Sequence, residues 1–141
     1  MKMKTAPAFA ALLLASACAT YDDFRTMEPI ARQKVAGDYR PLADCVADRL
    51  RSTDEEWHLV TSAQPVTRTA RITGTTMGLF GPSQTYLWDL ALVQEQPGVV
   101  RAETRSLSAL GSNNHAPRDL DDVVRTCASQ LAHQAVSPTQ R

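Results

Sequence analysis

The stretch TYLWDLALVQEQPGVVRAETRS, residues 85–106, decides the fold of this chain. Apolar side chains recur at every second position of its first half, and its second half alternates small or apolar residues with charged ones. A period of two is typical of a half-buried β-strand, and the Pro97-Gly98 pair between the halves indicates a turn. The stretch therefore predicts a β-hairpin with these inward side chains: Tyr86, Trp88, Leu90, Leu92, Val100, Ala102 and Thr104.

The register of this hairpin follows from its inward sides. They match when the loop consists of Gln96, Pro97 and Gly98, with Gly98 in the left-handed conformation. In that register Asp89 faces Arg105 on the outer side of the sheet, where an ion pair would satisfy an acid in mid-strand. A proline at this place is disfavoured in a type I turn, so a bulge or another kind of turn is the alternative.

Four more segments extend the pattern on both sides of the hairpin. VTRTARITG, residues 66–74, alternates with Val66, Ala70 and Ile72 inward, and EWHLVTS, residues 56–62, is a weaker strand. PLADCVADRLRS, residues 41–52, and PRDLDDVVRTCASQLAHQ, residues 117–134, space their apolar residues by three and four, as helices do. The expected fold is α+β, a two-layer sandwich of helix, three or four antiparallel strands in a meander, and helix, with both helices on one sheet face.

Cys45 and Cys127 lie on the core-facing sides of the two predicted helices. If the helices pack side by side, the two sulfurs can bond and close a loop of about 82 residues, which is worth about 4 kcal/mol in the chain-entropy model. A redox or metal-binding pair is the alternative, but the sequence has no C-x-x-C motif and no histidine at ligand spacing from either cysteine. We therefore expect a structural disulfide.

The amino terminus has the pattern of a bacterial export signal. Lys2 and Lys4 precede an apolar run over residues 6–15, which small residues follow. A transmembrane helix needs about 20 mostly apolar residues, whereas only 17 uncharged positions separate Lys4 from Asp22. Residues 1–17 are therefore expected to be a signal peptide and not a membrane span.

The end of this signal, Leu14-Ala15-Ser16-Ala17-Cys18, resembles the signal of bacterial lipoproteins, with Ala15 where such signals usually have Leu. The resemblance implies a Cys18 that carries diacylglycerol and an N-acyl chain such as palmitate, and Ala19 favours the outer membrane over the inner one. Ala15-Ser16-Ala17 also suits an ordinary signal peptidase, which would release a soluble protein beginning at Cys18. Because Cys45 and Cys127 account for each other, acylation explains the third cysteine better.

The remaining chain is long enough for one domain. We expect a lipidated tether over residues 18–39, in which PIARQKVA, residues 29–36, could form a short helix, then a single α+β domain over residues 40–134 and a flexible tail over residues 135–141. Fifteen basic and fifteen acidic residues are scattered along the sequence without a basic stripe. This balance argues against a nucleic-acid partner.

Two surfaces are candidate interaction sites. On the outer side of the strand at residues 85–95, apolar side chains surround Asp89, either because neighbouring threonine and arginine side chains cover a central strand or because a partner or second copy docks there. The loop GTTMGLFGPSQ, residues 74–84, either caps the core or contacts a protein, ligand or lipid surface. The candidate residues are Met77, Leu79, Phe80, Leu87, Asp89 and Val93.

The functional expectation follows from these features. The sequence has no G-x-S-x-G, H-E-x-x-H or paired-carboxylate signature, and we expect neither an enzyme nor a cofactor or metal site. The first hypothesis is a lipid-anchored outer-membrane protein that faces the periplasm, is held in the membrane through Cys18 and binds an unknown envelope protein. The alternative is a small-molecule or lipid-binding module, whose pocket would lie between sheet and helices near Tyr86 and Trp88.

Overall fold

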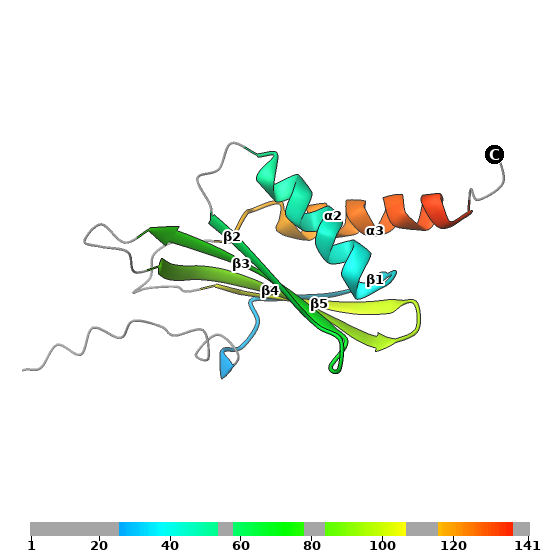
Figure 1. The fold of residues 1–141 in the computed structure, drawn as a ribbon, viewed down its shortest axis with the longest axis horizontal. Coiled ribbons are helices and arrows are strands. Elements are labelled where there is room, and N and C mark those ends of the chain that lie inside the picture. The colour runs from blue at the N-terminus through cyan, green and yellow to red at the C-terminus, as the bar shows by residue number, and fades with distance from the viewer. Residues whose placement is uncertain (1–25, 54–57, 78–83, 107–115, 137–141) are drawn as a thin grey trace, which may run out of the picture.

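The structure is a computed structural model that describes residues 26–53, 58–77, 84–106 and 116–136. In these ranges, two helices and one antiparallel sheet of five strands confirm the α+β class (Figure 1). The elements follow in the order β1 (Ala31–Ala36), α2 (Tyr39–Arg51), β2 (His58–Gln64), β3 (Thr69–Met77), β4 (Gln84–Gln96), β5 (Val99–Ser106) and α3 (Leu120–Val136).

The sheet has the strand order β1-β5-β4-β3-β2. Strands β2 to β5 are neighbours in the order of the sequence, while β1 lies beside β5 at the far edge. The chain therefore passes from one edge of the sheet to the other through α2. Figure 1 shows α2 and α3 on the same side of the sheet.

Strand β1 corrects two expectations. PIARQKVA was expected to belong to a tether, in which it could form a short helix, but Ala31–Ala36 pairs with β5 over six residues. Exposure alternates along β1, and the half-buried Gln33 donates through Nε2 to the backbone oxygen of Asp121 on α3, at 3.2 Å. The seven residues between Pro29 and Gly37 are too few for a stable helix, whereas the free edge of β5 offers a partner for six of them. The folded part thus begins before residue 40, and the sheet has five strands instead of three or four.

The core lies between the helices and the sheet. Six of the seven inward side chains expected from the hairpin are nearly fully buried, and Tyr86 is half-buried. Helix α2 begins at Tyr39, two residues before Pro41, because the side chain of Asp38 caps it by accepting from the backbone nitrogen of Arg40 at 3.0 Å. Val66 was expected to face inward but is 96% exposed, since it lies in the turn before β3.

The turn between β4 and β5 resolves the question of register. Asp89 does pair with Arg105 across the strands, as the matching inward sides predicted. The loop, however, is Pro97-Gly98 and not three residues, because a register shift between Gln94 and Gln96 takes up the additional residue as a bulge. Gly98 has a φ of +77°, the expected left-handed conformation.

The buried side chain of Gln94 fixes this bulge to the start of α2. Its Oε1 accepts from the backbone nitrogen of Tyr39 at 2.9 Å. Its Nε2 donates to the backbone oxygens of Gly37 at 3.0 Å and Gln96 at 2.9 Å. Nε2 also lies 3.3 Å from the backbone oxygen of Val99, so one amide links the bulge and its turn to the start of α2.

The disulfide between Cys45 and Cys127 is confirmed. It joins α2 to α3, with the two Cα atoms 5.9 Å apart and 82 positions of sequence between them. The helices pack against each other at this point, and Cys127 is fully buried. Neither helix in the described ranges is long and apolar enough to cross a membrane.

Candidate functional site

The two ends of the loop predicted over residues 74–84 are strand instead, because β3 extends to Met77 and β4 begins at Gln84. The remainder of that loop lies outside the described residues. Leu79 and Phe80 belong to residues 78–83, and for Met77 the structure describes the backbone at the end of β3 but not the side chain. The role of this loop stays a prediction. The three other candidate residues, Leu87, Asp89 and Val93, lie on β4.

These three residues do not form one apolar surface. Leu87 is half-buried and packs against the core, next to the register shift that follows Gly74 on β3. Val93 is half-buried too, and Asp89 is completely buried. Polar side chains of the neighbouring strand, Arg71 and Thr73, lie against Asp89.

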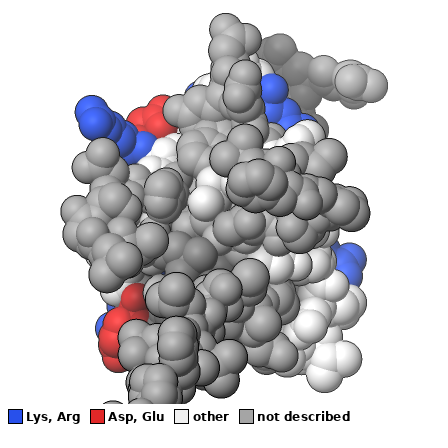
Figure 2. All heavy atoms as spheres, turned by 90° about the vertical axis from the view of Figure 1, so that its left-hand side faces the viewer, with Lys and Arg blue, Asp and Glu red and all other residues white. Residues whose placement is uncertain are grey.

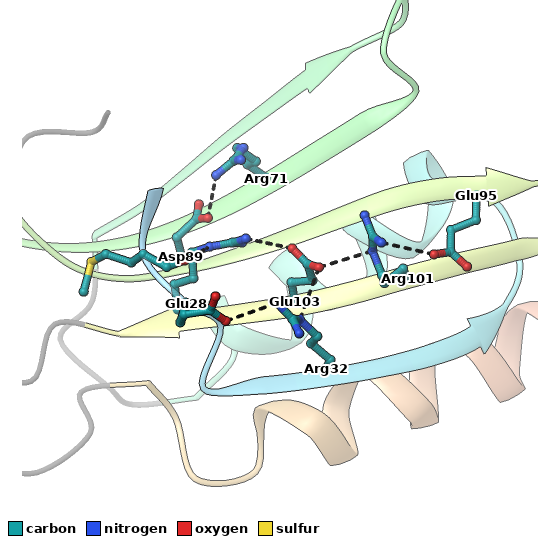
Figure 3. Close-up of polar contacts among 9 residues, drawn as sticks. Glu28, Arg32, Arg71, Asp89, Glu95, Arg101 and Glu103 are labelled. Carbon is teal, nitrogen blue, oxygen red and sulfur yellow. Dashed lines mark hydrogen bonds and ion pairs between the residues drawn. The ribbon is translucent and has the colours of Figure 1, made fainter. Parts of the chain in front are cut away.

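Charged side chains form a series of ion pairs on the outer face of the sheet, which we define as the face of the residues that alternate with the core-facing ones (Figure 3). The series extends over β3, β4, β5 and β1. We call it the charged band, and it consists of Glu28, Arg32, Lys34, Arg71, Asp89, Glu95, Arg101, Glu103 and Arg105.

The buried end of the charged band is Asp89. Its Oδ2 lies 2.7 Å from Nη1 of Arg71, and its Oδ1 accepts from the hydroxyl of Thr73 at 3.2 Å. Arg105 lies opposite Asp89 in the register, but its guanidinium donates to other groups: Nε to the backbone oxygen of Met27 at 2.9 Å and Nη2 to Glu103 at 2.8 Å. The predicted neighbour is thus correct, while the direct ion pair is made by Arg71.

The middle of the charged band is Glu103 on β5. Besides Arg105, its carboxylate lies 3.2 Å from Nε of Arg101 and 3.6 Å from Nε of Arg32. One nearly buried acid therefore interacts with three guanidinium groups. Among the described residues, no group accepts a hydrogen bond from the buried Nη1 of Arg105.

The exposed end of the charged band lies around the β4 bulge and β1. Glu95 is 2.7 Å from Nζ of Lys34 and 3.3 Å from Nη1 of Arg101, and the hydrogen bond from Lys34 is the main cause that lowers the pKa of Glu95. The side chains of Arg32 and Lys34 are 57% and 66% exposed, whereas that of Asp89 is 0% exposed. The charged band thus runs from a fully buried end at Asp89 to a solvent-exposed end, the rim, at Arg32 and Lys34.

Burial raises the pKa of Asp89 above its ordinary value of 3.8, and Arg71 and the hydroxyl of Thr73 offset only part of this effect. In the pH window above 3.8, the folded protein retains a proton that the unfolded chain has lost. The free energy of unfolding should therefore fall as the pH rises from 3.8 through the folded-state pKa of Asp89, and should level off above it.

Asp89→Asn should remove this contribution. We expect the free energy of unfolding of the variant, measured by urea denaturation from pH 3.5 to 7, to fall less with rising pH across that window than the free energy of the original protein. Asp122→Asn is the matched control, because it removes an acid that is exposed on α3 and lies outside the charged band. A slope that Asp89→Asn does not alter would contradict the raised pKa.

Three hollows are formed by described residues. The first, of about 270 Å³, lies between α2 and the strands β2 and β3, and is lined by Arg40, Ala43, Asp44, Thr61, Ser62, Ala63, Ala70 and Arg71. The other two, of about 280 and 80 Å³, lie beside α3. Neither Tyr86 nor Trp88 lines any of these three. In the part of the chain that the structure describes, no three His, Cys, Asp or Glu side chains are grouped so that they could hold a metal ion.

The charges of the described residues are mixed at the end of the molecule that Figure 2 shows, where basic and acidic side chains both occur. The charged band has the same character, since it contains five bases and four acids. No protein-family model, curated protein or solved structure matches this chain.

The alternation of the sequence placed Asp89, Arg101, Glu103 and Arg105 on one outer face, but it missed the contribution of β1. Arg32 and Lys34 belong to the segment that was expected to be a tether. The signal that could have found them is weak: two bases at alternate positions between Pro29 and Gly37.

Proposed function

We propose that this chain is a lipid-anchored accessory protein of the bacterial envelope, which faces the periplasm and binds another protein without catalysis. In this proposal the domain is a two-layer sandwich, and the outer face of the sheet is the binding surface because the helices leave it uncovered. The charged band carries the proposal, since it extends across four strands of that face and ends in exposed bases.

The buried part of the charged band supports a binding role. Side chains around Asp89 and Glu103 are held by several hydrogen bonds each, so their positions are fixed before a partner arrives. Preorganised charged groups lose little entropy on binding and give specificity through complementary charges. Arg32, Lys34 and Arg101 remain accessible at the rim. A partner protein that presents carboxylates would suit them, because arginine binds a carboxylate with two parallel hydrogen bonds.

The anchor is proposed from the amino terminus together with the disulfide. The bond between Cys45 and Cys127 occupies two of the three cysteines. In an oxidising compartment a third thiol would be left without a partner, and acylation of Cys18 removes it. Several acyl chains, each gaining about 0.8 kcal/mol per buried methylene, would hold the protein firmly on a membrane.

Crosslinking in intact cells tests the binding face. A photoreactive residue at position 34 of the full chain should give one defined protein adduct, because Lys34 is exposed at the rim of the charged band. The same residue at position 125, which is exposed on α3, should give none. In the chain with the probe at position 32, Lys34→Glu together with Arg101→Glu should lower the adduct yield about tenfold or more, as expected when like charges face an acidic partner.

Three outcomes would contradict the parts of this proposal separately. Equal adducts from positions 34 and 125 would mean that the outer face is not selective. Loss of the adduct in Leu79→Ser with Phe80→Ser, but not in the Lys34 and Arg101 variant, would transfer the binding site to the loop. Cys18→Ser should release the protein from membranes, and if the variant stays bound, acylation of that residue is not the anchor.

A further inference from the structure

The two edges of the sheet differ sharply in their protection. At one edge, β1 carries the exposed bases Arg32 and Lys34, and α3 packs over its inner side. Exposed charges on an edge strand prevent pairing with another chain. The β1 edge is therefore protected against pairing with a strand of another chain.

At the other edge, α2 packs near the inner side of β2, but the strand itself carries no such charges. Its sequence, HLVTSAQ, contains no Lys, Arg, Asp, Glu, Pro or Gly. Six of its seven residues are exposed, and the apolar Val60 is 44% exposed. Among the described residues β2 pairs only with β3. Alternate residues of an antiparallel strand direct their N–H and C=O groups away from the partner, so β2 presents a row of backbone groups that can bind another strand.

The sequence of β2 is complementary to itself. If a second copy pairs antiparallel about a two-fold axis at the central Thr61, all seven residues are paired and each pair lies on one face of the sheet. Val60 then faces Ser62, Leu59 faces Ala63, and Thr61 faces its own copy. No like charges meet in this register, and a Thr–Thr pair is favourable across antiparallel strands.

The groove beside β2 supports the same occupant. It has a volume of about 270 Å³, and α2 contributes Arg40 and Asp44 to its lining opposite Thr61, Ser62 and Ala63. The two α2 side chains have opposite charges. A two-fold axis through Thr61 places the α2 helices of the two copies antiparallel and facing each other. Arg40 of each copy can then pair with Asp44 of the other, which gives two equivalent ion pairs. Such reciprocal pairing is the property of an interface between identical chains.

We propose that the chain forms a two-fold homodimer through antiparallel pairing of β2 with β2 of a second copy, centred on Thr61, which joins the two sheets into one of ten strands. The dimer leaves the charged band accessible on each copy. It is independent of the binding partner proposed above.

Disulfide trapping in the full chain tests the register. With Thr61→Cys, the two new thiols lie on facing residues whose Cα atoms are about 4.5 to 5.5 Å apart, a range that a disulfide can span. Gln64→Cys is the matched control on the same strand, since in this register the two thiols lie about 20 Å apart. We expect the oxidised Thr61→Cys dimer to form at least about tenfold faster than the Gln64→Cys dimer. The parent chain gives the background of crosslinking without a new cysteine.

The association itself is tested without a new cysteine. The full chain in detergent should have the mass of a dimer, and Thr61→Lys should weaken dimerisation about tenfold or more by placing two like charges on the axis. Val66→Lys, at an exposed position of the neighbouring turn, should not weaken it. A monomeric parent chain, equal trapping at positions 61 and 64, or an adduct of β2 with a different protein in place of the dimer would overturn the proposal.

Discussion

Replacing Cys45 and Cys127 together by Ala should lower the free energy of unfolding by about 4 kcal/mol. The bond closes a loop of 82 positions, which contains β2, β3, β4 and β5 between the two helices that it joins. In the unfolded chain it removes the many conformations in which these ends are far apart. A domain of this size is stable by only about 5 to 15 kcal/mol, so the bond supplies a large share of that stability.

Urea denaturation of the oxidised parent chain and of the double variant measures this difference. Cys18→Ser is the matched control, because it removes a cysteine without touching the link between α2 and α3, and it should leave the unfolding midpoint unchanged. Reduction of the parent chain should reproduce most of the loss seen in the double variant. A loss below about 1 kcal/mol would show that packing of α2 on α3 holds the helices together without the bond.

The hairpin could be predicted from the sequence because the information that specifies it is local. Inward and outward residues alternate over both strands, and matching their inward sides gave the pairing of Asp89 with Arg105. Strand β1 could not be predicted in the same way. Its six residues pair with Val99–Thr104, more than sixty positions away, and half of its side chains face water in either a strand or a tether. Only the free edge of β5 in the folded sheet makes this segment a strand and not a tether.

The same limit applies to the candidate site. The sequence indicated an acid in mid-strand that needs a base, and the register offered Arg105 directly opposite. The structure instead pairs Asp89 on β4 with Arg71 on β3. Thr73 is the β3 residue directly opposite Asp89, and Arg71 lies two positions from it, so the contact is diagonal. Arginine is long enough for diagonal contacts, and Glu103 binds the guanidinium of Arg105. Alternation gives the face of each residue, while competition among several acids and bases decides which pairs form.

Gly74→Ala is expected to destabilise the protein by about 3 kcal/mol. Gly74 on β3 lies directly opposite Trp88 on β4, and the indole covers the position where a side chain would begin. A Cβ atom at residue 74 would lie 2.1 Å from Nε1 and 2.2 Å from Cε2 of Trp88. Trp88 is completely buried and is the largest such side chain in the described core. Because close-packed neighbours surround the ring, it cannot move aside without disturbing them.

A double-mutant cycle attributes the loss to this one contact. Trp88→Phe leaves a smaller ring that lacks the indole atoms nearest to Gly74, so the double variant should be more stable than the sum of the two single effects predicts, by about 1 kcal/mol or more. Circular dichroism in urea is the suitable measurement, since Trp88→Phe alters the fluorescence. Additive effects would mean that the contact between residue 74 and the indole is not the cause of the loss. Coupled effects would mean that the absence of a side chain at residue 74 is what allows a tryptophan to fill the centre of this sheet.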